Sequence, residues 1–535
     1  MGEDAVTVPG AAAARIEDWF LTASERGNPA TQLDARHLGE QAWSTGNLAR
    51  PLIHGATYFA ELFAAVRRME RGDLLMFVDW RGDPDERLTG EPGSEVSRLL
   101  REAIERGVDV HGLIWRSHLD RFQFSADENR RLDEDLEDAG GNCLLDMRVR
   151  VGGSHHQKFV VLRHAARPEL DVAFVGGIDL CHSRRDDARH LGDPQKQPMA
   201  AVYSDRPPWH DIQLAITGPA VADVETVFRE RWDDPQPVSR NPVHRLADLV
   251  RHDDYRHVPL PARLPDPAPT GPHSVQLLRT YGQRLGGYSF APNGERSVAR
   301  GYAKALRRAR RLIYLEDQYL WSEEVARHIA DALQASPELR MIAVLPHFPD
   351  QDGRAMPPNL IGRNAALKSI FAAAPGRVGV YGIENHAGTP VYVHAKVCVL
   401  DDIWAAVGSD NFNRRSWTHD SELTAAVWDD AAAGTADSFA VALRTALARE
   451  HLDLAEDDPT DITDPHALFD AFAASAAALQ RWHDSGRAGP RPPGRLRRLA
   501  ATPVPLRTRL WAVPLCRLVY DPDGRGTALR RRGRF

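Results

Sequence analysis

The sequence is poor in cysteine and has no long apolar run. Its four cysteines in 535 residues include no Cys-x-x-Cys pair, which excludes a disulfide-rich scaffold and favours a reducing compartment. No stretch of about eighteen uninterrupted apolar residues predicts a membrane span. The first residues, Met-Gly-Glu-Asp, are acidic and unlike a signal peptide. We therefore expect a cytoplasmic protein, with a peripheral position at a membrane as the alternative.

Lysine is also scarce, although basic residues as a group are not. The chain has 67 Lys and Arg against 74 Asp and Glu, a formal net charge of −7, so nucleic acid is not the expected partner. Only five lysines occur, at positions 158, 196, 304, 368 and 396. With 22 histidines in the chain, chance alone would produce about 0.2 His-x-Lys triplets. Two are present.

The two triplets are His156-Gln157-Lys158 and His394-Ala395-Lys396, and an aliphatic run follows each of them. Side chains two residues apart on a strand point to the same face. Each triplet would therefore direct an imidazole and an ammonium group into one space, where an anion is the expected occupant. Two copies of this pattern indicate a site with two halves.

An internal duplication surrounds the triplets, which lie 238 residues apart by their histidines (394 − 156). In each copy helical and strand-like patterns alternate, and a Gly-rich turn follows the triplet. The expected helices are 56–71, 95–106, 297–311 and 323–335, and the expected strands are 74–78, 108–115, 312–315 and 339–345.

This order predicts an α/β fold of two duplicated α/β/α halves packed together around one active site. We divide the chain into five segments: an N-terminal extension (1–50), a first half (51–235), a Pro-rich connector (236–272), a second half (273–460), and a helical, then Arg-rich, C-terminal tail (461–535). Because both copies lie in one chain, a monomer is sufficient for the site.

Paired histidines and lysines suit phosphodiester chemistry without a metal or another cofactor. One neutral imidazole can attack phosphorus while the other, protonated, gives its proton to the departing alcohol. The lysines can hold the non-bridging oxygens. From spacing alone, either histidine could take either role.

The motifs resemble those of the phospholipase D superfamily over about residues 50–430. Its signature is His-x-Lys, four residues, Asp, six residues and Gly-Ser-x-Asn, and the downstream copy matches throughout. The upstream copy is similar to the eukaryotic-type version, in which the turn reads Gly-Gly-Ile-Asp, as at 176–179. The matching downstream residues are His394, Lys396, Asp401, Gly408, Ser409 and Asn411.

The resemblance implies roles for these residues. His156 would be the nucleophile and His394 the general acid, with Lys158, Lys396 and Asp401 completing the catalytic set. Phosphate binding or orientation of the catalytic groups would fall to Asp179, Ser409, Asn411, Glu422 and Asp187.

One position departs from the family pattern. Arg163 stands where the upstream motif should have its Asp, and about six extra residues, near 164–170, precede the turn. Asp171, beyond this insertion, is the candidate replacement for the missing carboxylate.

The resemblance implies hydrolysis of a glycerophospholipid to phosphatidic acid and a head-group alcohol, with head-group exchange as a related reaction, and so a phospholipid substrate and peripheral contact with a membrane surface. The first alternative is a cardiolipin synthase-type phosphatidyltransferase or a nuclease of the same superfamily. The second is a non-catalytic protein that binds phosphoanions or lipids through a decayed first motif.

Overall fold

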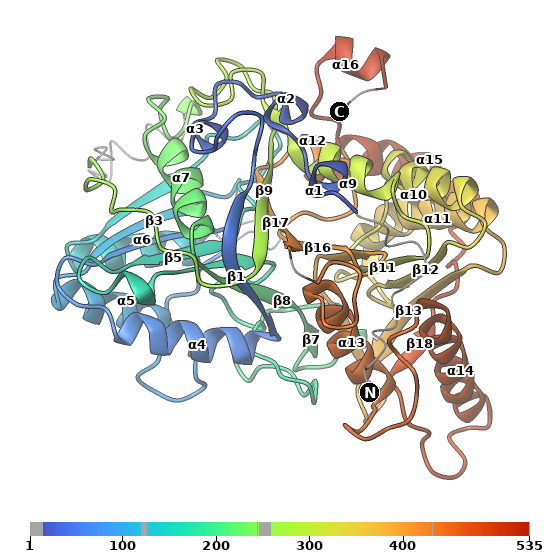
Figure 1. Cartoon of the computed structure of the whole chain (residues 1–535). Coiled ribbons are helices and arrows are strands. Elements are labelled where there is room, and N and C mark those ends of the chain that lie inside the picture. The colour runs from blue at the N-terminus through green and yellow to red at the C-terminus, as the bar shows by residue number, and fades with distance from the viewer. Residues whose placement is uncertain (1–13, 119–125, 243, 245–257, 431, 534) are drawn as a thin grey trace, which may run out of the picture.

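The computed structural model describes residues 14–118, 126–242, 244, 258–430, 432–533 and 535. Two mixed β-sheets form its centre (Figure 1). In the first sheet the strands are ordered β4-β3-β2-β5-β6-β8-β1. Their bounds are β1 (Ser44–Ile53), β2 (Leu74–Asp79), β3 (Asp109–Trp115), β4 (Asn142–Asp146), β5 (Phe159–Arg163), β6 (Val172–Gly176) and β8 (Ile212–Thr217).

The second sheet repeats this order as β13-β12-β11-β15-β16-β17-β9. Parallel and antiparallel neighbours also occur in the same sequence in both sheets, so the predicted duplication and fold class are confirmed. The bounds are β9 (His273–Tyr281), β11 (Leu312–Glu316), β12 (Arg340–Val344), β13 (Val378–Glu384), β15 (Val397–Leu400), β16 (Trp404–Gly408) and β17 (Glu422–Asp429).

The two sheets are joined through β1. Its first residues pair with β9 of the second sheet, and from Leu48 onward it pairs with β8 of the first. The predicted boundary between residues 50 and 51 therefore lies inside this joining strand. A second connection is made by two short strands, β7 (Trp209–His210) and β14 (Pro390–Val393), which pair in parallel.

Helices cover the sheets in equivalent places. α4 (Gly55–Arg67), α5 (Val96–Glu105) and α6 (Ala126–Asp138) pack on the outer face of the first sheet. α9 (Ser297–Leu306), α10 (Glu323–Ala335) and α11 (Met356–Ala373) do the same in the second. α7 (Ala220–Trp232) and α13 (Phe439–Leu452) contribute to the core between the sheets.

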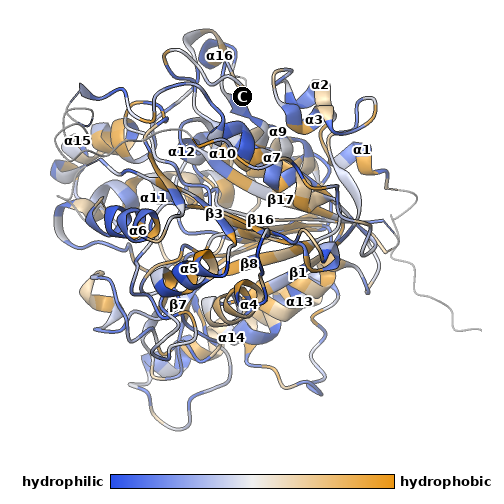
Figure 2. Cartoon of the chain, turned by 90° about the vertical axis from the view of Figure 1, so that its left-hand side faces the viewer, coloured by the Kyte–Doolittle hydropathy of each residue, from blue (hydrophilic) through white to orange (hydrophobic). Residues whose placement is uncertain are grey.

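Local sequence explains these elements. β2, Leu-Leu-Met-Phe-Val-Asp, is buried at all six positions, as expected for a strand covered on both faces. α10 begins at the N-cap Ser322, with Glu323 and Glu324 in its first turn. Figure 2 shows hydrophobic residues on the central strands β8, β16 and β17 and hydrophilic residues on the outer sides of α5 and α6.

Shorter elements complete the described chain. β18 extends the second sheet by pairing with β13, and β10 pairs with β9. No helix in the described ranges is both long and apolar enough to span a bilayer. The additional bounds are α1 (Ile16–Trp19), α2 (Ala23–Arg26), α3 (Gln32–Ala35), β10 (Glu295–Arg296), α12 (Arg414–Thr418), α14 (Pro465–Asp484), β18 (Leu496–Arg498), α15 (Leu506–Leu515), the π-helical turn η4 (Cys516–Tyr520), α16 (Thr527–Arg531), and the 3-10 turns η1 (Pro168–Leu170), η2 (Ala201–Tyr203) and η3 (Gly353–Ala355).

Candidate active site

Each His-x-Lys segment is anchored on the opposite half of the molecule. The backbone N–H of His156 donates to the carbonyl of Ser421 at 2.9 Å, and that of His394 donates to the carbonyl of His210 at 2.8 Å. The two contacts are equivalent, because Ser421 directly precedes β17 and His210 comes two residues before β8. The duplicated halves thus hold each other's motif.

The side chain of His156 is bound by Glu422. Its Nδ1 lies 2.9 Å from Oε2 of this carboxylate, which is buried at the start of β17. Ser409 supports the pair, since its hydroxyl donates to the same oxygen at 2.6 Å. With Nδ1 engaged, Nε2 is the ring nitrogen of His156 available for chemistry.

His394 has a matching carboxylate from the first half. Its Nδ1 lies 2.6 Å from Oδ2 of Asp211, which is fully buried immediately before β8. Trp209 packs near this imidazole, with ring centroids 5.0 Å apart. Each motif histidine is therefore oriented by a carboxylate from the other half.

The two lysines are buried next to the histidines. Lys158 Nζ donates to the carbonyl of His156 at 2.9 Å and lies 3.4 Å from Oδ1 of Asp179. Lys396 Nζ donates to the carbonyl of His394 and to Oε1 of Gln318, the latter at 3.2 Å. Both ammonium groups are thus fixed on the side of the histidines, as the two-residue spacing predicts.

The Gly-rich turns bring the remaining residues of the motifs together. A Cβ at Gly177 would press against the Asp211 carboxylate, and a Cβ at Gly408 would press against Thr424. Asn411, on the second turn, is buried, and its Oδ1 has no hydrogen-bond partner among the described residues. This carbonyl is available to bind a lysine or a donor on the substrate.

Burial governs the titration of the site. It lowers the pKa of His156 well below its usual value, and the charges of Lys158 and Lys396 lower it further. It lowers the pKa of Lys396 to about 8, with a contribution from Lys158. Because charges of one motif act on groups of the other, the two motifs share one electrostatic environment.

The two carboxylates differ in protonation. Burial, together with repulsion from Asp420, raises the pKa of Glu422 to about 8. Burial acts in the same direction on Asp211, but the charge and hydrogen bond of His394 outweigh it and hold the pKa of Asp211 below its usual range. At neutral pH, Glu422 keeps its proton and Asp211 is ionised.

Asp401 is not brought into this site. It follows β15 at the end remote from Lys396, about 15 Å away along an extended strand. Its carboxylate accepts hydrogen bonds from the backbone N–H groups of Arg310, Arg311 and Leu312 at 2.6–2.9 Å. The predicted catalytic role therefore has no geometric support, and Asp401 instead caps the chain as it enters β11.

The departure at Arg163 is explained by the same geometry. Arg163 is buried at the remote end of β5, where its Nε donates to Asp171 Oδ2 at 2.9 Å and its Nη1 pairs with Glu225. Asp171 also accepts from the backbone N–H of His164 at 2.6 Å. The missing carboxylate belongs to the end of the strand far from the histidines, so its loss leaves the reacting groups in place.

Asp187 makes no recorded contact with either motif histidine among the described residues. Its carboxylate binds the side chain of Arg189 and is 41% exposed. Asp179 and Glu422, in contrast, contact Lys158 and His156 directly. The orienting residue of the first half is Asp211, whose carboxylate binds His394 Nδ1; the motif pattern does not mark it.

Two family models match the chain. The model "Phospholipase D" matches residues 87–339, and the model "Cardiolipin synthase, PLD-like domain" matches residues 302–440. Together they cover both His-x-Lys motifs.

Known proteins are similar over much of the chain. Phospholipase D alpha 1 of Cynara cardunculus is 26% identical over 490 residues, which cover 69% of this chain and 60% of the relative. Phospholipase D A of Dictyostelium discoideum is 25% identical over 444 residues, covering 70% of this chain and 32% of the relative. The chain thus spans less than two thirds of the length of these two curated relatives.

Among solved structures, a phosphatidylserine synthase of Haemophilus influenzae gives a TM-score of 0.48 at 14% identity, covering 72% of this chain and 82% of that one. The motif geometry and the two family models agree, and they establish the family at the level of an enzyme superfamily. The chain belongs to the phospholipase D superfamily.

Proposed function

We propose that this chain is a phosphodiesterase of the phospholipase D type, which hydrolyses glycerophospholipids to phosphatidic acid and a head-group alcohol through a phosphohistidine. The observation that carries the proposal is the reciprocal pairing of the motifs. Each His-x-Lys pair has its own orienting carboxylate from the opposite half, His156 with Glu422 and His394 with Asp211. Two-step phosphoryl transfer needs such a pair of independently held imidazoles.

In the first step Nε2 of His156 attacks phosphorus, so that a P–N bond forms and the P–O bond to the head group breaks. Protonated His394 gives its proton to the departing oxygen. In the second step His394 removes a proton from water, the water oxygen attacks phosphorus, and the P–N bond breaks to release phosphatidic acid. Lys158 and Lys396 offset the charge on the non-bridging oxygens.

The role of nucleophile for His156 rests on the family resemblance, and the state of Glu422 supports it. A carboxyl group that keeps its proton at neutral pH gives His156 no charge with which to hold a second proton. A neutral imidazole is the form that can attack phosphorus.

The test is a parallel substrate panel. Vesicles of phosphatidylcholine and phosphatidylethanolamine are assayed for released choline and ethanolamine, with and without an added primary alcohol, next to plasmid DNA. We expect head-group release, and its loss by about 10³-fold or more in His156→Ala and in His394→Ala. His466→Ala, on α14, is the matched control. Unchanged release in both catalytic variants would refute the proposal.

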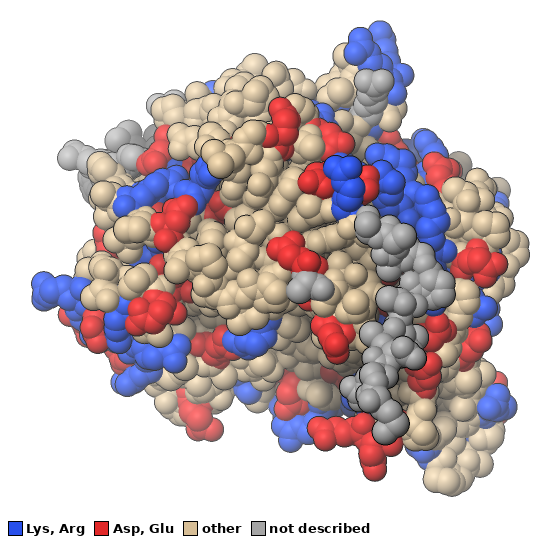
Figure 3. Space-filling model, viewed as in Figure 1, with Lys and Arg blue, Asp and Glu red and all other residues tan. Residues whose placement is uncertain are grey.

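Phosphatidyl transfer is the second candidate, because the second half matches a model described as a cardiolipin synthase domain. Here an alcohol replaces water in the second step. Products formed with phosphatidylglycerol and with the added alcohol separate the two reactions. A nuclease is disfavoured by charge, since acidic and basic side chains are interspersed on the face shown in Figure 3 and the formal net charge is −7.

We further propose that the substrate is met at an anionic lipid surface. α15 and η4 expose the apolar side chains of Leu506, Leu510 and Leu518 at 75–76%, with exposed Arg507, Arg509 and Arg517 among them. Apolar side chains flanked by cations suit the interface of anionic lipids. The segment also adjoins the second motif, because Arg415 on α12 donates to the carbonyl of Val519 at 2.8 Å.

Vesicle sedimentation tests this contact. Leu510→Ser combined with Leu518→Ser should weaken binding to phosphatidylglycerol-containing vesicles about tenfold or more, while cleavage of a monomeric short-chain lipid stays unchanged. Leu38→Ser, at a side chain 91% exposed elsewhere, is the control. Equal binding by the double variant and the wild type would show that another surface meets the lipid.

A further inference from the structure

A cluster of three histidines and one glutamate lies beside the active site and takes no part in the chemistry described above. His54, His190 and His210 come from the first half and are buried, and Glu450 comes from α13 of the second half. One nitrogen or oxygen of each side chain lies within 4.8 Å of those of the others. His54 precedes α4, His190 lies in the segment between β6 and β7, and His210 ends β7.

The distances between the side-chain atoms of the cluster are close to those between the ligand atoms of one metal ion. Oxygens of Glu450 lie 2.7 Å from Nε2 of His54, 3.0 Å from Nε2 of His190 and 3.7 Å from Nδ1 of His210. Four ligands held tetrahedrally at about 2.0–2.1 Å from a zinc ion are about 3.3 Å apart. The observed separations bracket that value.

The three rings are also arranged as ligands of one ion would be. Their centroids are 4.9, 5.2 and 5.8 Å apart, and each pair meets edge-on rather than stacked. Imidazoles that point one nitrogen at a common ion about 2 Å away have centroids about 5 Å apart. Stacked or parallel rings could not converge in this way.

For two of the three histidines, His190 and His210, the opposite ring nitrogen is held as it is in known metal sites. His190 Nδ1 is 3.0 Å from the carbonyl of Trp209, and His210 Nε2 is 2.6 Å from Glu316. Glu316 in turn binds His451 at 2.8 Å and the hydroxyl of Tyr314 at 2.6 Å. Histidine ligands typically donate their other N–H to a carboxylate or a carbonyl, which fixes the tautomer that leaves a lone pair for the metal.

His210 supplies a further observation. Its Nε2 faces Glu316, and its buried Nδ1, 3.7 Å from Oε1 of Glu450, has no hydrogen-bond partner among the described residues. A buried polar atom without a hydrogen bond is costly. A metal ion in the centre of the cluster would satisfy it.

The backbone is strained at two of the four positions. His54 has φ 68° and His190 has φ 52°, in the left-handed region that residues with a Cβ rarely adopt and in which the backbone is strained. Such strain persists where surrounding contacts require it. Here it brings both imidazoles onto Glu450.

We propose that His54, His190, His210 and Glu450 bind a divalent transition-metal ion, with zinc as the best match to three imidazoles and one carboxylate. The ligands are nitrogen and oxygen donors without a thiolate, in a set small enough for tetrahedral coordination. The ion would join three segments of the first half to α13 of the second.

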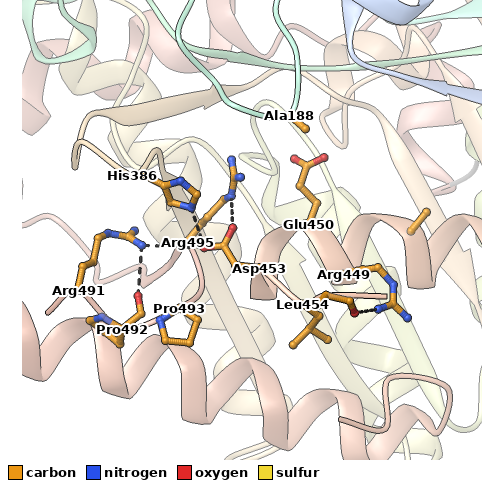
Figure 4. Close-up of a pocket in the computed structure, with 12 residues that line it drawn as sticks. Ala188, His386, Arg449, Glu450, Asp453, Leu454, Arg491, Pro492, Pro493 and Arg495 are labelled. Atoms are coloured by element: carbon orange, nitrogen blue, oxygen red, sulfur yellow. Dashed lines mark hydrogen bonds and ion pairs between the residues drawn. The ribbon is translucent and has the colours of Figure 1, made fainter. Parts of the chain in front are cut away.

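A route to the site is present. Glu450 lines an open hollow of about 990 Å³ together with Ala188, His386, Arg449, Asp453 and Arg495. Figure 4 shows the Glu450 carboxylate directed toward Ala188, on the segment that carries His190, and apart from the pairs made by Asp453. An ion can therefore reach this carboxylate from solvent, while the three histidines behind it stay buried.

The position next to the active site gives the ion a structural consequence. His210 directly precedes Asp211, the carboxylate that orients His394, and the carbonyl of His210 accepts from the backbone N–H of His394. An ion that holds His210 in place would therefore also hold Asp211 and the backbone of His394 in place. The ion is thus a positioning element and does not contact the phosphate.

Metal analysis of the full-length protein tests the proposal. We expect the purified protein to carry about one equivalent of metal, and His54→Ala and Glu450→Gln to carry about a fifth of that or less. His386→Ala, at a histidine that lines the same hollow and binds Asp453 instead, should keep its metal. Chelation of the wild type should lower Tm, and added zinc should restore it.

A cobalt titration covers the case in which the variants fail to fold. Chelated wild-type protein should bind about one equivalent of Co²⁺ and develop the intense visible absorption of a tetrahedral site. A folded wild type that contains no metal and takes up neither Co²⁺ nor Zn²⁺ would overturn the proposal. Full metal content in both ligand variants would equally place any metal elsewhere and refute this site.

Discussion

The two orienting carboxylates, Glu422 and Asp211, differ in pKa, and the raised pKa of Glu422 can be tested through the pH dependence of the free energy of unfolding. Glu422 is buried next to Asp420, and its pKa is raised to about 8 from a usual value of 4.5. The folded state therefore keeps this proton up to about pH 8, whereas the unfolded chain releases it near pH 4.5. The stability that this group contributes is complete below pH 4.5 and is lost as the pH rises toward 8.

Glu422→Gln should remove this pH dependence. Relative to the wild type, the variant should gain about 2–4 kcal/mol in free energy of unfolding between about pH 4.5 and pH 8, since each pKa unit is worth about 1.4 kcal/mol. Urea unfolding of both proteins at several pH values gives the difference. Because the pKa of His156 is lowered, this histidine makes stability rise with pH. It does so in both the wild type and the variant, so its contribution largely cancels when the two proteins are compared. A difference that stays constant with pH would contradict the raised pKa.

Asp401 offers a second test at the scale of single residues, because its motif position predicts catalysis and its contacts indicate a structural role. Asp401→Ala would leave three backbone N–H groups without their acceptor. We expect a loss of about 1–3 kcal/mol in unfolding free energy, with kcat/KM nearly unchanged. A large fall in kcat/KM in a variant of normal stability would restore Asp401 to the catalytic set.

These residues also show what sequence can and cannot predict about the site. The spacing of His156 and Lys158, and of their counterparts, correctly predicts that each pair lies together, but both triplets lie in the segments just before β5 and β15 and not on the strands themselves. The partner of each imidazole is not local: Glu422 is 266 residues from His156, and Asp211 is 183 residues from His394. No single-sequence pattern connects such pairs, so the sequence does not identify Asp211 as the partner of His394, and Asp187, named for phosphate binding or orientation, binds Arg189 instead.

At the scale of elements, β5 differs from its equivalent β15 in the residue found at the strand end far from the motif histidines. β15 is followed by Asp401, which caps backbone N–H groups, whereas β5 ends in Arg163. The Nε of Arg163 pairs with Asp171, and its Nη1 pairs with Glu225 on α7. Arg163 Nη2 also donates to the carbonyl of Pro265 at 2.6 Å. The arginine therefore links strand, helix and connector.

Arg163→Ala should accordingly destabilise the protein without disabling the site. Removal of one partner from a buried ion pair costs about 3–5 kcal/mol, so a clear fall in Tm is expected while kcat stays within about threefold. Arg163→Asp, which restores the family residue, should be less stable still, because it faces Asp171 and Glu225. Higher kcat in Arg163→Asp would show that the first motif is weakened in the native sequence.

The order of helices and strands can be predicted because it depends on local sequence. Periodic apolar patterns predict the helices and strands, and their repeat at 238 residues predicts two similar halves. The joining strand β1 and the short pair β7–β14 are missing from that prediction, because their pairing partners lie in the other half and their own sequences carry weak patterns. These same elements hold the two motifs together.

At the scale of the whole molecule, strand pairing joins the two halves of the chain directly. β1 pairs with β9 across the halves, and β7 pairs with β14. Residues 154–156 bind 420–422 through backbone and side chain, including the Ser154 N–H to Asp420 at 3.0 Å. We therefore expect that one copy of the chain supplies both histidines of its own site.

Mixing two inactive variants therefore should not restore activity. His156→Ala and His394→Ala each lack one imidazole, and an intact pair could arise only if halves were exchanged between chains. We expect the mixture to stay at the level of the separate variants, below about 1% of wild type, both when mixed natively and over a wide range of protein concentration. Co-refolding the two variants from urea is the positive control for exchange, since unfolded chains can reassemble with swapped halves. Recovery toward about a quarter of wild-type activity after native mixing would show that the site is shared between chains, whereas recovery only after co-refolding would leave the single-chain site intact.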